Sequence, residues 1–141
     1  MERFVYSATF KGAAEPANEA GTELKARTTT SALAALDGSR VPAGVGPALQ
    51  FESTVVIGED GLFAESGTID FGAGNSIRFS ELVRGAMAPA ADGLTAGTIG
   101  WKVESGTGVF AGASGYIGSN FTVGGAGEVT DHHVGAILLG S

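Results

Sequence analysis

Short runs of alternating apolar and polar residues, separated by glycine, are the feature that most constrains what this chain can fold into. In the first run, Arg3 to Phe10, one face carries Phe4, Tyr6, Ala8 and Phe10. A period of two is typical of a half-buried β-strand, because successive side chains point to opposite faces of the sheet. The 24 glycines follow no three-residue period, which excludes collagen. The pattern therefore predicts strands joined by turns.

About eight strands follow from this pattern, at residues 3–10, 23–30, 49–57, 62–71, 76–87, 95–104, 116–123 and 128–139. Gly-rich and Asp-Gly segments mark the turns between them. Residues 11–21 and 41–47 are predicted to be loops, and Ser31 to Leu36 one short helical turn. No helix is long enough to alternate with the strands. We therefore expect an all-β fold, an eight-stranded antiparallel barrel with an apolar interior, forming a single domain over residues 1–141.

The charge of the chain limits its partners. Its net charge is −7, and its eight Lys and Arg residues are scattered, so we expect neither nucleic-acid binding nor binding to an anionic membrane. Charged residues make up 16% of the chain, against roughly 25% in an average globular domain, and the mean hydropathy is +0.21. This balance indicates that part of the outer surface is covered by another subunit. We expect a homo-oligomer, a dimer or a trimer.

The absence of cysteine excludes disulfides, thiolate metal sites and a cysteine nucleophile. The N-terminal residues lack the basic start and apolar run of a secretory signal. No apolar stretch approaches the roughly 18 residues that span a bilayer. These observations predict a soluble, cytoplasmic protein.

The segment Gly106 to Gly115, with the sequence GTGVFAGASG, is rich in glycine. It has no following Lys-Ser/Thr pair and opens no helix, so a phosphate-binding loop is not expected. A tight corner between two barrel strands explains the glycines better.

This segment, followed by a strand, resembles the GTG-F-GA-G signature of the allene oxide cyclase and dirigent-like barrels. The similarity covers Phe51 to Leu139 and is best over residues 100–122. It implies an eight-stranded antiparallel barrel with an apolar cavity. Members of these families include cyclases that steer closure of a reactive lipid and dirigent proteins that steer radical coupling, often as dimers or trimers. This chain lacks the longer N-terminal part of the plant cyclases, so their substrate is not transferred to it.

Glu81 is the first candidate for acid–base chemistry. Alternation along its strand places it on one face with Ile77, Phe79, Val83 and Met87. A carboxylate on an apolar face has its pKa raised by desolvation, which suits a general acid or base. The structural alternatives are that Glu81 pairs with a cation or that a bulge turns it outward.

His132 and His133 are the only histidines of the chain and are adjacent. Neighbours on a strand point to opposite faces, so at most one faces the interior, where it could move protons; the alternative is a solvated or backbone-bonded side chain. Because a metal site needs further ligands, we expect no metal and no cofactor.

Five further side chains are candidates to contact a bound ligand: Tyr6, Phe79, Trp101, Tyr116 and Asn120. The two tyrosines could each place a hydroxyl in the cavity, whereas Trp101 also fits a purely structural core position.

Three functions remain open. The favoured one is an isomerase or cyclase that acts without a cofactor on a small hydrophobic metabolite held inside the barrel. The second is a non-enzymatic carrier of an apolar ligand, with polar groups that pair among themselves. The third is a structural oligomeric module whose barrel is filled by its own side chains. Small barrels of eight strands can be filled or hollow, so the fold does not decide among these functions.

Overall fold

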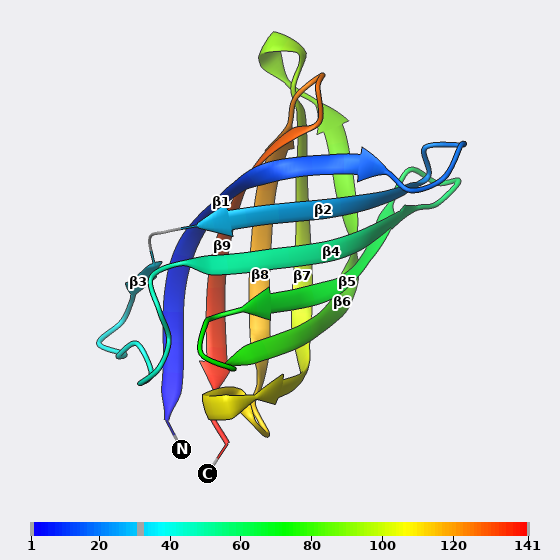
Figure 1. Ribbon diagram of the computed structural model, residues 1–141. Helices are drawn as coiled ribbons and strands as arrows, with labels where there is room; N and C mark the ends of the chain where they lie inside the picture. The colour runs from blue at the N-terminus through cyan, green and yellow to red at the C-terminus, as the bar shows by residue number, and fades with distance from the viewer. Residues whose placement is uncertain (1, 31–32, 141) are drawn as a thin grey trace.

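The computed structural model describes residues 2–30 and 33–140 of the chain. Within these residues the secondary structure is almost entirely strand (Figure 1). The strands are β1 (Arg3–Pro16), β2 (Glu23–Thr30), β3 (Leu33–Ala35), β4 (Leu49–Ile57), β5 (Phe63–Asp70), β6 (Ser76–Pro89), β7 (Thr95–Thr107), β8 (Ser114–Val123) and β9 (Glu128–Leu138). Two short 3₁₀ turns, Ala91–Gly93 and Gly108–Phe110, follow β6 and β7.

All of these strands except β3 close into an eight-stranded antiparallel barrel, which confirms the predicted fold. Closure depends on β1, which pairs with β9 over residues 3–13 and with β2 over residues 11–16. Gly12 lies where β1 has both neighbours, and a Cβ there would come within 2.0 Å of the carbonyl oxygen of Arg27. Because Gly12 has no side chain, β1 can approach β2 closely enough to pair with it and close the barrel.

Two sequence-based predictions are wrong at this closure. Lys11–Pro16 was expected to be loop, but it continues β1 because its main chain pairs with β2. The predicted helical turn is replaced, over Leu33–Ala35, by strand β3, which pairs with Tyr6–Ala8. Residues 31 and 32, the rest of that turn, lie outside the described residues. In both places strand pairing outweighs the local sequence signal, which favours a loop in the first segment and a helical turn in the second.

Aromatic side chains fill much of the barrel. At the end where the two termini lie (Figure 1), Phe4 stacks on Tyr6 at 4.9 Å between ring centroids, and Phe71 packs against Phe110 at 4.6 Å. Burial of such rings is a large part of the stability of a small domain. We refer to Phe4, Tyr6, Phe71 and Phe110 as the terminal-end cluster.

A second group, the central cluster, lies further along the barrel and consists of Phe10, Phe51, Phe79, Trp101 and His133. The ring of Phe79 stacks on Trp101 at 4.0 Å, and Phe51 stacks on Trp101 at 5.4 Å. Phe10 packs against the imidazole of His133 at 4.4 Å. All five side chains are at most 2% exposed.

Glycines on neighbouring strands make room for these rings. A Cβ at Gly135 would lie 2.4 Å from the ring of Tyr6, and one at Gly85 would lie 2.2 Å from the ring of Phe63. Some of the glycines in this sequence therefore serve packing rather than turns.

Candidate functional site

The barrel keeps a cavity of about 50 Å³, lined in part by residues next to the β1–β2, β6–β7 and β8–β9 turns. These hairpin turns lie at the end of the barrel away from the termini (Figure 1). We call this the hairpin-end pocket. Most of its wall is apolar, and two of its lining residues, Glu65 and Asp131, are acidic. The other lining residues are Ala14, Leu24, Ala26, Phe51, Val55, Met87, Phe121, Val123 and Val129. A cavity of this size admits the reacting end of a small molecule rather than a whole drug-sized ligand.

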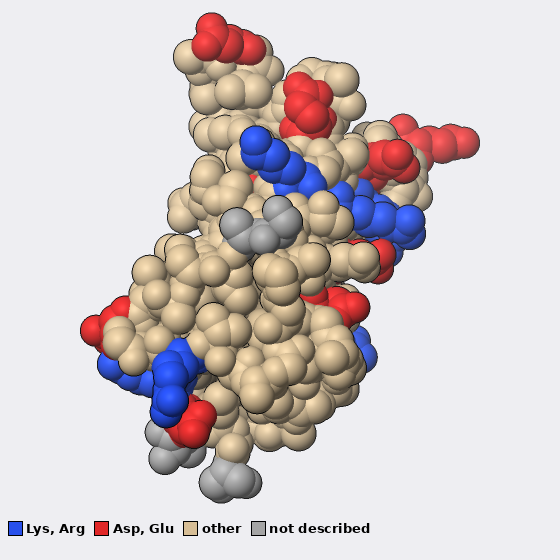
Figure 2. Space-filling view, turned by 60° about the vertical axis from the view of Figure 1, so that its left-hand side comes forward, with Lys and Arg blue, Asp and Glu red and all other residues tan. Residues whose placement is uncertain are grey.

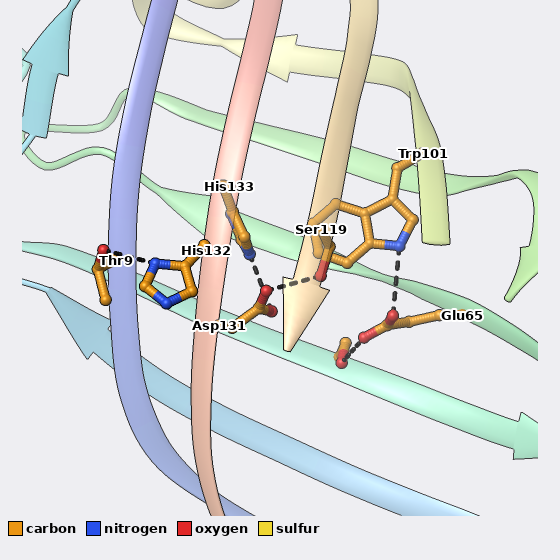
Figure 3. Close-up of polar contacts among 8 residues, drawn as sticks. Thr9, Glu65, Trp101, Ser119, Asp131, His132 and His133 are labelled. Atoms are coloured by element: carbon orange, nitrogen blue, oxygen red, sulfur yellow. Dashed lines mark hydrogen bonds and ion pairs between the residues drawn. The ribbon is translucent and has the colours of Figure 1, made fainter. Parts of the chain in front are cut away.

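Glu65 reaches the pocket because alternation along β5 turns Phe63, Glu65 and Ile69 toward the interior. Ser53 Oγ donates a hydrogen bond to its Oε2 at 2.5 Å, and Trp101 Nε1 donates to its Oε1 at 3.2 Å (Figure 3). Burial raises the pKa of this carboxyl to about 8, although the two hydrogen bonds oppose the shift; the charges of Asp131 and Glu81 add to it. At neutral pH Glu65 therefore holds a proton for most of the time.

Asp131 stands on β9 and is 4% exposed. Ser119 Oγ donates to its Oδ1 at 2.7 Å, and His133 Nε2 lies 3.0 Å from its Oδ2 (Figure 3). Both carboxyl oxygens of Asp131 therefore have a hydrogen-bond partner. The pocket thus combines one carboxyl that burial keeps protonated with a second carboxyl that Ser119 and His133 hold in place.

Two buried polar atoms near these carboxyls have no hydrogen-bond partner in the described part of the chain: Tyr6 Oη and His133 Nδ1. Burial, and to a smaller extent the charge of Asp131, raises the pKa of the Tyr6 phenol, which keeps it neutral. Such atoms are costly inside a protein unless another group serves them. Both atoms belong to the aromatic clusters, Tyr6 to the terminal-end cluster and His133 to the central cluster, so each cluster contains one buried polar atom of this kind.

The prediction for the two histidines is confirmed: only one faces the interior. His133 is 1% exposed, whereas His132 lies on the outer face with its Nδ1 3.1 Å from Thr9 Oγ1 (Figure 3). His132 is thus separated from the pocket by its own strand.

Glu81 is not among the residues that line the pocket. It is half-buried, and its Oε2 accepts a hydrogen bond from the backbone N–H of Glu65 at 3.2 Å. The pairing of β6 with β7 shifts between Glu81 and Val83, and Val83 is 61% exposed. The predicted apolar face is therefore interrupted at the bulge: placing Val83 on it was wrong, whereas Met87 further along the strand lines the pocket. Glu81 supports the backbone that carries the interior acid.

Three of the five predicted ligand contacts, Tyr6, Phe79 and Trp101, are buried inside the barrel. Tyr116 and Asn120 are exposed on its outer face, Tyr116 at 61%, which corrects the expected interior position. The reason is strand parity, because Ile117, Ser119 and Phe121, which alternate with Tyr116 and Asn120 along β8, point inward.

Glu65 and Asp131 were not singled out from the sequence, although a signal was present. Glu65 alternates in phase with Phe63 and Ile69, and Asp131 is in phase with His133 and Ile137. An acidic residue in phase with apolar residues on a strand is the pattern that would have identified both.

Comparisons of the chain with described protein families, with curated proteins and with solved structures each found no match. Among the described residues, no three His, Asp or Glu side chains come together as a metal ion would require. No helix in residues 2–30 or 33–140 is long and apolar enough to cross a membrane.

Proposed function

We propose that this protein is a cofactor-independent isomerase or cyclase that binds the end of a small hydrophobic metabolite in the hairpin-end pocket. The observation that carries the proposal is that two buried carboxyl groups, Glu65 and Asp131, line one apolar cavity. A carboxyl on an apolar wall costs stability, which a role in catalysis would explain. As a finer part of the proposal, the corner at Gly108–Phe110 and its likeness in sequence support distant kinship with the allene oxide cyclase and dirigent-like barrels.

The two carboxyls suit complementary roles in proton transfer. Glu65, protonated at neutral pH, donates its proton to an unsaturated ligand: the O–H bond breaks and a new bond to hydrogen forms on the ligand. The positive charge that develops is stabilised by Asp131 and by the face of Phe51. Asp131 then accepts a proton from a neighbouring carbon, whose bonding electrons form the new double bond. Exchange with water restores both carboxyls, so no oxidant or cofactor is consumed.

A non-enzymatic carrier is the second candidate, and one observation favours it. All four carboxyl oxygens of Glu65 and Asp131 have a hydrogen-bond partner among Ser53, Trp101, Ser119 and His133. A carrier needs polar groups that pair among themselves and no reactive acid.

The test begins with native mass spectrometry of the purified protein, its M87W variant and its V56W variant. Met87 lines the pocket, whereas Val56 is 48% exposed on the outside of the barrel and serves as the matched control. We expect a co-purified small molecule on the wild type and on V56W, and none on M87W.

The recovered molecule is then incubated with protein in D₂O and followed by mass spectrometry. An isomerase that works by proton transfer introduces deuterium at carbon, and E65Q reduces the rate by about 100-fold or more, the usual effect of losing a general acid. Retention of the ligand without deuterium would establish the carrier instead. Absence of any ligand from the wild type, together with no binding from a panel of apolar compounds, would contradict both functions and leave the structural module.

A further inference from the structure

The charged groups in the wall of the hairpin-end pocket indicate which ligands it can bind. Its two ionisable lining residues are both acids, and no Lys or Arg is among the described residues that line it. Phe51 and Phe121 add two aromatic rings to the wall. Apolar walls with aromatic faces and an anion are the surroundings that organic ammonium ions favour.

The outer rim carries acids together with some Lys and Arg. Figure 2 shows Asp and Glu side chains on the tips that project at the upper end of the molecule, with Lys and Arg side chains beside and below them. The exposed acids of the hairpin turns are Glu19, Glu59, Asp92 and Asp60, the last of which pairs with Arg84, and Glu128 begins β9. Clustered like charge beside a low-dielectric opening concentrates ligands of the opposite sign.

From the acidic cavity and its rim we propose that the ligand of this pocket carries a basic nitrogen, an amine or imine, on a small apolar body. The inference rests on the proposed function, because it names the substrate class of the same site. A neutral nitrogen enters, accepts the proton of the Glu65 carboxyl, and leaves an ammonium or iminium ion facing two carboxylates. The N–H bond forms as the O–H bond of Glu65 breaks, and no other reactant is required.

For an imine, the same geometry completes an isomerisation. Protonation at nitrogen makes the adjacent C–H bond acidic, and Asp131 accepts that proton while the electron pair forms the enamine double bond. The product is the enamine tautomer of the imine. Atoms and electrons balance, since one proton is added at nitrogen and one is removed from carbon.

The titratable groups around Glu65 come from several strands. Asp131 acts on it from β9 and is itself in contact with His133, Glu81 contacts its backbone from β6, and Tyr6 approaches the same interior from β1. None of these groups is a Lys or Arg, and the one imidazole among them lies against Asp131.

The experiment compares three probes of similar shape and different charge: cyclopentylamine, cyclopentanol and cyclopentanecarboxylate. Binding is followed by the indole N–H resonance of Trp101, the only tryptophan of the chain, whose Nε1 donates to Glu65. We expect cyclopentylamine to bind at least about 10-fold more tightly than cyclopentanol, and cyclopentanecarboxylate to leave the resonance unchanged.

Two variants with the same Glu-to-Gln substitution locate the effect. E65Q should remove the preference for the amine, whereas E52Q should keep it, because Glu52 is exposed on the outer face of β4. E52Q should also bind cyclopentanol as the wild type does.

Each outcome separates this inference from the proposed function. Equal or tighter binding of cyclopentanol would overturn the basic-nitrogen ligand and leave an apolar binding pocket in place. A preference for the amine that E52Q also abolishes would show attraction by the overall charge and equally contradict the inference. If no probe, and no compound of the apolar panel, perturbs Trp101, the proposed function fails together with it.

Discussion

The two ends of this barrel differ in how their interiors are used. At the terminal end, Phe4, Tyr6, Phe71 and Phe110 pack ring against ring and are fully buried. At the hairpin end, a small cavity remains, and two carboxyls occupy its wall. Close-packed aromatic rings contribute to stability, whereas buried acids reduce it unless their partners compensate. The comparison indicates that the terminal end stabilises the barrel and the hairpin end holds its chemistry.

The largest effect should come from opening the terminal end. Phe110→Ala removes a fully buried ring from its contacts with Phe4 and Phe71, and we expect the free energy of unfolding to fall by about 3–5 kcal/mol. Met87→Ala, at the half-buried wall of the pocket, should cost only about 1 kcal/mol. Urea denaturation measures both. Equal losses would contradict the assignment of stability to the terminal end.

A smaller loss of stability is expected when the space beneath the ring of Tyr6 is filled. Gly135→Ala places a Cβ 2.4 Å from Tyr6, so the ring must move, at a cost of about 1–3 kcal/mol. Gly118→Ala is the matched control, because its Cβ would come no closer than 3.9 Å to the nearest atom. Thermal unfolding of the two variants should differ by several degrees. A Gly135→Ala protein as stable as the control would mean that the rings are not tightly packed.

The buried acid at the hairpin end, Glu65, should make the stability of the protein depend on pH. The pKa of Glu65 is raised from 4.5 to about 8 in the folded state, so the folded protein keeps a proton that the unfolded chain releases. The associated stability is present in full below pH 4.5 and is lost as pH rises to about 8, with a slope of at most about 1.4 kcal/mol per pH unit.

E65Q should remove this contribution, while Phe110→Ala should leave the slope in place on a less stable protein. Unfolding free energies from urea titrations at several pH values between 4.5 and 8 provide the comparison. An unchanged slope in E65Q would show that Glu65 titrates normally and would contradict the account of this carboxyl.

Much of the fold could be predicted from the sequence because alternation and turn residues are local signals. The bounds of β2 and β4 agree with prediction to the residue. The extension of β1 and the whole of β3 could not be predicted, since they depend on pairing between segments distant in sequence.

The candidate site was predictable in part. Adjacent residues on a strand must alternate, so one interior histidine followed from the sequence, and His133 is that residue. Alternation along the strands also indicates that Glu65 and Asp131 face the interior. That the two side chains line one pocket depends on barrel closure and could not be predicted. The bulge after Glu81 has no clear sequence signal, and a shift of one residue there reverses which side chains face inward.

The methyl group of Met87 provides the most direct test of the central claim, that ligands enter at the hairpin end. The chain has only two methionines, so ¹³C-methyl labelling gives a simple spectrum in which one substitution assigns Met87. Titration with cyclopentylamine should shift the Met87 methyl resonance, saturate at the same concentration as the Trp101 indole resonance, and give a nuclear Overhauser contact between probe and methyl. A Met87 methyl that remains unperturbed while the probe binds elsewhere would contradict the account.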